Sequence, residues 1–310
     1  MRPIFFNRQD ILRSGWRAAI FILCFTFATA VLSTSTRAVL NTMGVETLAG
    51  TQVYLILGAV SSLVSALIAG WICARYLEGL PFRSLGLAFS VNWHTHLALG
   101  IVVGGLTLCT TLLLLLLVGS LSFASNHTST PNEIIQSLAT SLVVFSVAAA
   151  FEEVLFRGYL LQTFARSGLA WFAIAATAVI FGAVHSGNPN ADLISTANTV
   201  LAGFWFGYAY LKTRDLWFVW GVHLMWNWMQ GSIFGIEVSG LTAVTEHPIL
   251  REIDHGPNWL TGGEYGVEAG VACTAAIIMS IILIRFIPWL KPDVEMSRLT
   301  GQPHAEPGNT

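Results

Sequence analysis

Residues Leu97–Leu121 read LALGIVVGGLTLCTTLLLLLLVGSL, and none of them carries a charge. An uninterrupted apolar stretch of about 18 or more residues indicates a helix that crosses the hydrocarbon core of a bilayer. This stretch therefore predicts a transmembrane helix in the first half of the chain.

Seven further stretches meet the same criterion. They are Trp16–Ser33, Val53–Cys73, Leu138–Phe156, Leu169–His185, Leu193–Leu211, Leu216–Phe234 and Val267–Ile287. The helix that starts at Leu138 is expected to follow a loop at 131–136, with Asn132 as its cap, and to continue past Arg157 toward Arg166. No A-x-A cleavage pattern follows the first stretch, so we expect it to be retained as a span.

We therefore predict an all-α fold, a polytopic membrane helix bundle with about eight transmembrane helices that forms one domain over residues 1–290. The composition agrees with this class: 54% of the 310 residues are hydrophobic and only 10% are charged, whereas soluble domains carry roughly 25% charged residues. Residues 291–310 are polar and contain Pro and Gly, and we expect them to form a disordered cytoplasmic tail.

The charge balance argues against nucleic acid as a partner. The formal net charge is −2 and the sequence has no stripe of basic residues that could neutralise phosphates. The four cysteines, Cys24, Cys73, Cys109 and Cys273, all lie in apolar stretches and form no C-x-x-C pair. They therefore indicate neither a disulfide framework nor a thiolate metal site.

The positions of the basic residues predict the orientation of the chain in the membrane. If the N-terminus is cytoplasmic, only Arg37 and Arg251 of the 15 Lys and Arg residues fall outside. Cytoplasmic loops of membrane proteins carry an excess of positive charge. We therefore predict that both termini lie inside.

Two adjacent acids interrupt the fourth apolar stretch, in the sequence Phe151-Glu-Glu-Val-Leu-Phe-Arg157. Ionisable residues at membrane depth are expensive and usually serve a function. Glu153 and Arg157 are four residues apart, on one helix face, and can neutralise each other. Glu152 projects about 100° away from Glu153 and has no partner within this segment. The alternative is that all three residues anchor the helix ionically at the cytoplasmic interface.

The fifth stretch ends in Phe181-Gly-Ala-Val-His185. The fourth and fifth stretches are expected to form a hairpin whose turn lies near Ser167. Glu152 is 15 residues before Ser167 and His185 is 18 after it, so both side chains are expected roughly 22–27 Å from the turn. A carboxylate and an imidazole at one depth can hold a water between them. The alternative is a histidine satisfied at the membrane interface.

The seventh stretch contains His223 and Asn227, which are four residues apart and share one helix face. His223 follows Asp215 by only eight residues. We therefore expect it to lie about 10–15 Å shallower than Glu152 and His185, unless a tilted or longer helix closes the gap. The alternative role for both residues is interhelical hydrogen bonding.

Together these side chains could carry out either of two kinds of hydrolysis. A carboxylate beside an imidazole can deprotonate a water, and a His and an Asn that project together can stabilise an oxyanion. Alternatively, Glu152, His185 and His223 could hold a zinc ion that leaves its fourth position for water. The residues alone leave this choice open.

The order of the motifs E-E-x-x-x-R, F-x-x-x-H and H-x-x-x-N resembles the CPBP family, which comprises type II CAAX prenyl endopeptidases and bacteriocin-processing enzymes. The motifs correspond here to Glu152, Glu153 and Arg157, to Phe181 and His185, and to His223 and Asn227. The resemblance covers roughly Leu138–Met229. It implies that Glu152 and His185 activate the water, that His223 and Asn227 stabilise the oxyanion, and that Glu153 and Arg157 support them. It leaves open whether the mechanism is glutamate-type or zinc-dependent.

The leading hypothesis is therefore an intramembrane endopeptidase that acts on a membrane-associated or prenylated, CAAX-like peptide or protein, with membrane lipid as its surroundings. A bacterial plasma (inner) membrane is the expected location. The sequence has no H-E-x-x-H, no G-x-G-D and no rhomboid-like serine motif, which argues against other intramembrane proteases. The rival hypothesis is a transporter or proton relay, with Gly203–Gly207 as a helix break. A scaffold without catalytic activity is a third.

Overall fold

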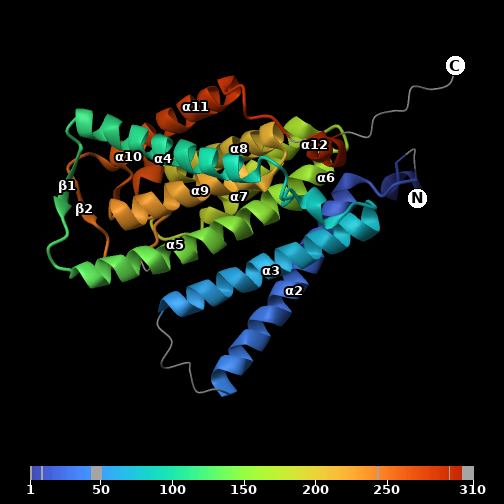
Figure 1. Cartoon of the computed structure of the whole chain (residues 1–310), viewed down its shortest axis with the longest axis horizontal. Coiled ribbons are helices and arrows are strands. Elements are labelled where there is room, and N and C mark those ends of the chain that lie inside the picture. The colour runs from blue at the N-terminus through green and yellow to red at the C-terminus, as the bar shows by residue number, and fades with distance from the viewer. Residues whose placement is uncertain (1, 8–9, 43–50, 243, 293, 302–310) are drawn as a thin grey trace.

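The computed structural model describes residues 2–7, 10–42, 51–242, 244–292 and 294–301, and these form an elongated bundle of helices (Figure 1). The elements in chain order are α1 (Arg2–Phe5), α2 (Ser14–Thr42), α3 (Thr51–Leu77), η1 (Phe82–Leu85), α4 (Trp93–Leu117), β1 (Leu121–Ser125), α5 (Pro131–Glu153), η2 (Val154–Leu161), α6 (Gln162–Ala165), α7 (Ala170–His185), α8 (Leu193–Thr213), α9 (Leu216–Trp228), η3 (Met229–Ile233), β2 (Leu250–Asp254), α10 (Asn258–Thr261), η4 (Gly263–Tyr265), η5 (Val267–Ala269), α11 (Val271–Phe286) and α12 (Val294–Thr300).

Four helical segments of the described chain are long and apolar enough to cross a membrane. They are Ser14–Thr42, Val53–Leu77, Trp93–Leu117 and Pro131–Ala165. The helices α7 and α11 are equally apolar but only 16 residues long. Large hydrophobic side chains on the outside of the bundle, such as Leu23, Phe27 and Leu117, are mostly exposed, as in a protein whose outer surface faces lipid. The expected class, a helical membrane bundle, is therefore supported.

The helix that carries the two acids is longer than its apolar stretch indicates. It begins at Pro131, not near Leu138, and its cap is Thr130 rather than the expected Asn132. Thr130 and Glu133 exchange hydrogen bonds in a capping box, which satisfies amide groups that the first turn of a helix otherwise leaves unpaired. The helix then passes without interruption through the π-helical η2 into α6.

The helices α4 and α9 pack closely along their length because small residues face each other. A Cβ atom on Gly100 would overlap the carbonyl oxygen of Phe218, and one on Gly104 would overlap that of Val222. Small residues of this kind allow the backbones of membrane helices to approach. This contact fixes the position of α9, which carries His223.

We expect Gly100→Ala to lower the melting temperature of the purified protein. The added methyl group would force α4 away from α9, and overpacking of this kind costs about 1–3 kcal/mol. Gly15→Ala is the matched control, since no atom lies within 4 Å of a Cβ at Gly15. If both variants melt like the wild type, the close packing of α4 on α9 is contradicted.

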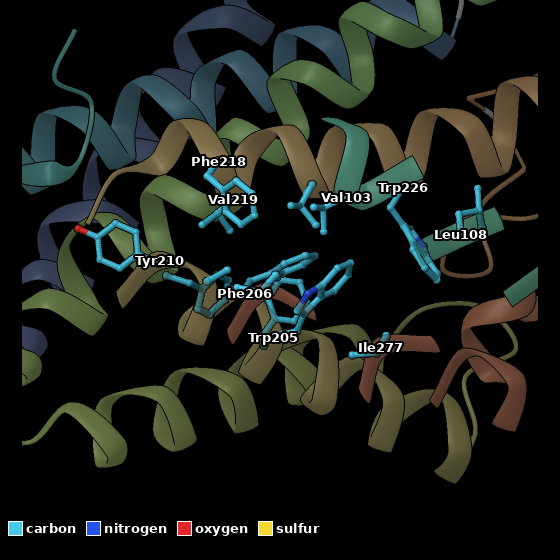
Figure 2. Packing of buried hydrophobic residues seen from close by; sticks show 14 of the residues in the cluster. Val103, Leu108, Trp205, Phe206, Tyr210, Phe218, Val219, Trp226 and Ile277 are labelled. Carbon is cyan, nitrogen blue, oxygen red and sulfur yellow. The ribbon is translucent and has the colours of Figure 1, made fainter. Parts of the chain in front are cut away.

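Aromatic side chains fill the centre of the bundle (Figure 2). Trp205 and Phe206 of α8 stack with their ring centroids 5.1 Å apart, and Trp226 of α9 meets Trp205 edge-on at 6.1 Å. All three are buried. The helix α8 runs through this core without interruption, so the helix break considered at Gly203–Gly207 does not occur.

Two parts of the fold differ from the sequence-based expectation. The strands β1 and β2 form an antiparallel pair at one end of the bundle (Figure 1), although no strand was expected. At the other end, residues 294–300 of the tail expected to be disordered form α12, because Met296 is buried and Glu295 pairs with Arg83. The remaining tail, residues 302–310, lies outside the described residues.

Candidate active site

The second of the two adjacent acids, Glu153, forms a buried ion pair with Arg157. Nη1 of Arg157 lies 3.0 Å from Oε1 of Glu153, as the spacing predicts, and both side chains are essentially inaccessible. Nη2 of Arg157 donates to the carbonyl oxygen of Gly203 at 3.1 Å. Its guanidinium also lies 4.9 Å from the ring centre of Phe181 and 5.2 Å from that of Phe206, where cation–π attraction is favourable. The pair is thus fixed from three helical segments.

Glu152 points away from this pair and meets two histidines. Its Oε2 lies 3.8 Å from Nε2 of His185 and 3.8 Å from Nε2 of His223. Those separations exceed a direct hydrogen bond, and Glu152 Oε2 has no hydrogen-bond partner. Three groups able to handle a proton therefore converge at one point.

The expected depth difference for His223 is wrong. The start of α9 lies beside the middle of the long helix: Cδ1 of Leu216 is 3.7 Å from the Cβ position of Gly158. Glu152 is six residues before Gly158 and His223 is seven after Leu216, so both lie roughly 9–11 Å from this shared level. The expectation placed the turn near Ser167 and the turn before α9 at the same depth. In the structure the turn before α9 lies deeper in the bundle, so His223 reaches the level of Glu152.

Each histidine is oriented by a hydrogen bond at its Nδ1. The Nδ1–H of His185 donates to the carbonyl oxygen of Phe181 at 2.8 Å, and the Nδ1–H of His223 donates to Oε1 of Glu153 at 2.9 Å. These assignments follow from the acceptors, since neither acceptor can donate. Both Nε2 atoms are thereby turned toward Glu152, and the Glu153 carboxylate stabilises positive charge on the His223 ring.

The three groups line a cavity of about 680 Å³. Asn227 lines it too, one helical turn after His223, as their spacing predicts. Most of the other lining side chains are apolar and come from α3, α5, α7, α8 and α9, including Leu55, Val144 and Val184. Volume and lining are typical of a site that takes an apolar ligand and fixes it with a few polar groups.

The structure brings together every residue that the sequence analysis placed in the site. Glu152, His185, His223 and Asn227 line the cavity, while Glu153 and Arg157 lie behind it. The sequence analysis missed one further acid, Glu268 of η5, which also lines the cavity. Nothing in the sequence around Glu268 indicates a place in the site.

The fit of these residues to a zinc ion is incomplete. The donor types suit zinc, and each histidine has the Nδ1 partner that metal-bound histidines commonly show. Donor atoms around a tetrahedral zinc ion with bonds of about 2.0–2.1 Å lie roughly 3.3 Å apart, whereas Glu152 Oε2 is 3.8 Å from both Nε2 atoms. Within the described parts of the chain, no group of three or more His, Cys, Asp or Glu side chains is placed to hold a metal ion.

Comparison with known families covers the centre of this site. Residues 134–229 match the family described as type II CAAX prenyl endopeptidase Rce1-like. The match contains all six residues of the sequence motifs that carry polar chemistry, and it excludes α2, α3, α4 and everything after residue 229, including Glu268. No curated protein is similar enough to this chain to count as a match.

Proposed function

We propose that this chain is an intramembrane endopeptidase that uses Glu152 to activate water, because residues 134–229 match the Rce1-like family of type II CAAX prenyl endopeptidases. The observation that carries the proposal is the convergence of Glu152, His185 and His223 in one apolar cavity. A water held there would lie within reach of a carboxylate and of an imidazole whose Nε2 is free to accept.

In the proposed reaction, Glu152 and His185 orient the water, and Glu152 accepts its proton as the water oxygen attacks the carbonyl carbon of the peptide. The carbonyl oxygen of the substrate becomes negatively charged in the tetrahedral intermediate. The C–N bond then breaks, and the proton held by Glu152 passes to the leaving nitrogen. One water is consumed, and the products are a carboxylic acid and an amine, which become a carboxylate and an ammonium group when the second proton of the water passes to the amine.

His223 and Asn227 are proposed to stabilise the oxyanion. Donors fixed in advance toward a developing negative charge are worth about 10²–10³-fold in rate each. For Nε2 of His223 to donate, the ring must be protonated, and the Glu153 carboxylate at its Nδ1 favours that form. Arg157 in turn holds Glu153. Glu153 and Arg157 are therefore positioning residues in this scheme.

The proposed substrate is a peptide or protein segment that enters the cavity from the membrane, and a prenylated, CAAX-like peptide is one member of that class. The cavity lining is mostly apolar, with residues such as Phe145, Leu155 and Ile277, and this supports an apolar substrate segment. Bacterial signal or bacteriocin precursors are other members. The purified chain in liposomes should cleave a fluorogenic apolar peptide, whereas a transporter would leave it intact and carry ions or solutes across the bilayer.

We expect cleavage to persist after exhaustive treatment with a zinc chelator, since the proposed steps use only side chains of this chain. Activity in liposomes should stay within about twofold of the untreated sample, because no zinc-activated water is required. Metal analysis of the purified protein is the control. Loss of activity on chelation, with recovery when zinc is added back, would contradict the glutamate-type mechanism.

The proposed arrangement in the membrane has eight crossings, formed by α2, α3, α4, α5–η2–α6, α7, α8, α9 and α11, with both termini in the cytoplasm of a bacterial cell. The basic residues at helix ends support it, since Arg75, Arg166 and Arg285 then lie at one surface. Reporter fusions after residues 125 and 291 should report opposite sides. The same side for both fusions would contradict the arrangement.

A further inference from the structure

Glu268 occupies a place in the cavity that the proposed reaction does not use. It belongs to η5, outside the segment that matches the family, and lies partly exposed at the wall of the same cavity as Glu152 and His185. Its neighbours on that wall are Ser239 and Trp226. The segment between α9 and α11 thus adds an acid, through η5, to a site that is otherwise built from α5, α7 and α9.

The Glu268 carboxylate is fixed in place by neutral donors, and no Lys or Arg among the described residues pairs with it. Its Oε1 accepts from Nε1 of Trp226 at 3.2 Å, and its Oε2 accepts from the amide of Ser239 at 2.6 Å and from its hydroxyl at 2.8 Å. Three neutral donors favour an ionised carboxylate but leave acceptor capacity on Oε1. Burial raises the pKa of Glu268, an effect opposed by these donors and by His185.

The charge of the cavity lining is one-sided. Glu152 and Glu268 are its two acids, and none of the described residues that line it is Lys or Arg. The nearest buried guanidinium, that of Arg157, is committed to Glu153 and Gly203 behind the wall. Even with His223 protonated, as its proposed oxyanion role requires, two carboxylates in the lining face one cationic side chain. A second cation brought into the cavity would complete the pairing, whereas an acidic side chain would add to the excess negative charge.

The surface next to the loop has the same sign. A second hollow is lined by Glu237, Glu252, Asp254 and Glu264, among other residues, and by one base, Arg251. Burial, together with the charges of Glu237 and Asp254, raises the pKa of Glu252 to about 8, so this carboxyl is largely protonated at neutral pH and the other acids supply the negative charge. A field of this sign attracts basic segments and repels acidic ones before they reach the cavity.

We propose that Glu268 is a substrate-recognition residue that selects segments carrying a Lys or Arg side chain near the scissile bond, and that an acidic side chain there is disfavoured. This inference rests on the proposed function in one respect, namely that the bound segment is cleaved. The preference for a basic side chain concerns binding alone. Trp226 connects Glu268 to the proposed catalytic residues, because its Nε1 donates to Glu268 and it lies on α9 between His223 and Asn227.

Binding can be measured without turnover on the Glu152→Gln variant, in which Glu268 is the acid that remains in the cavity. The ligands are apolar Leu/Ala-rich peptides with a dansyl group and one central Lys, norleucine or Glu, and energy transfer from the tryptophans is recorded in neutral phosphatidylcholine nanodiscs. We expect the Lys peptide to bind about tenfold more tightly than norleucine and the Glu peptide to bind more weakly than either. Empty nanodiscs correct for partitioning into lipid.

The comparison that decides the inference adds Glu268→Gln to the same background. The preference for Lys should shrink to about twofold or less, while Glu133→Gln, a change at an exposed acid that lines neither hollow, should leave it unchanged. If the variant with both substitutions does not fold, the peptide series on Glu152→Gln alone still decides. Equal binding of the three peptides overturns the inference, whether or not the wild type hydrolyses peptides.

Discussion

Glu152→Gln should lower kcat for cleavage of a membrane peptide by about 10³-fold, within the range that general-base catalysis contributes, and leave KM nearly unchanged. Gln has the shape of Glu but cannot accept the proton of the attacking water. Oε2 of Glu152 makes no hydrogen bond in the structure, so its replacement removes no hydrogen bond that holds the fold. The rate should be measured under single-turnover conditions in liposomes.

Glu133→Gln is the matched control for that substitution. Glu133 lies on the same helix but at its capping box, and Gln can replace Glu in this motif. Its kcat should equal that of the wild type. If Glu152→Gln retains more than about a tenth of the wild-type kcat, Glu152 is not the general base.

Arg157→Met should produce the largest loss of stability, about 3–5 kcal/mol. The substitution leaves the carboxylate of Glu153 buried beside His223 without its cation, and both members of the pair are inaccessible to solvent. The melting temperature of the purified protein should fall sharply, and cleavage should fall with it, because Glu153 orients His223.

A second variant separates the charge effect from loss of packing. In Glu153→Gln/Arg157→Met both charges are absent, and the Gln oxygen can still accept from Nδ1 of His223. Replacing a whole buried pair is often close to neutral, so most of the melting temperature should return. If the double variant is as unstable as Arg157→Met, the contribution of Arg157 lies in packing and not in its charge.

The sequence predicted the four helices that are long and apolar enough to cross a membrane, and the pairing of Glu153 with Arg157, because both depend on local spacing. Apolar length and i,i+4 geometry need no knowledge of the fold. The equal depth of Glu152 and His185 was also predictable, because one short turn joins their helices. Their separation of 3.8 Å agrees with that reasoning.

The position of His223 was not predictable in the same way. Its depth depends on where the turn before α9 lies, and that turn is held by a contact between the amide of Leu216 and the carbonyl of Gly86, 130 positions earlier in the chain. The β1–β2 pair likewise joins Leu121 to Asp254. Contacts between such distant residues leave no periodic signal in a single sequence.

Two local features had signals that the apolar pattern concealed. The capping box Thr130-Pro-Asn-Glu133 marks the true start of α5, but counting apolar residues gave Leu138. The π-helical turn that follows Glu153 is frequent at functional sites, yet its residues Val154–Leu161 continue the apolar pattern of an ordinary helix. The sequence around Glu268 does not indicate a place in the site, because Glu268 reaches the cavity only when the segment between α9 and α11 folds against it.

The central claim is that this chain hydrolyses a peptide bond with a water activated by Glu152. The most direct test is mass spectrometry of an apolar peptide after incubation with the purified protein in liposomes prepared in H₂¹⁸O. We expect two fragments from the wild type, with one ¹⁸O in the new carboxyl group, and intact peptide from Glu152→Gln. An intact peptide with the wild type, or equal cleavage by the variant, would contradict it.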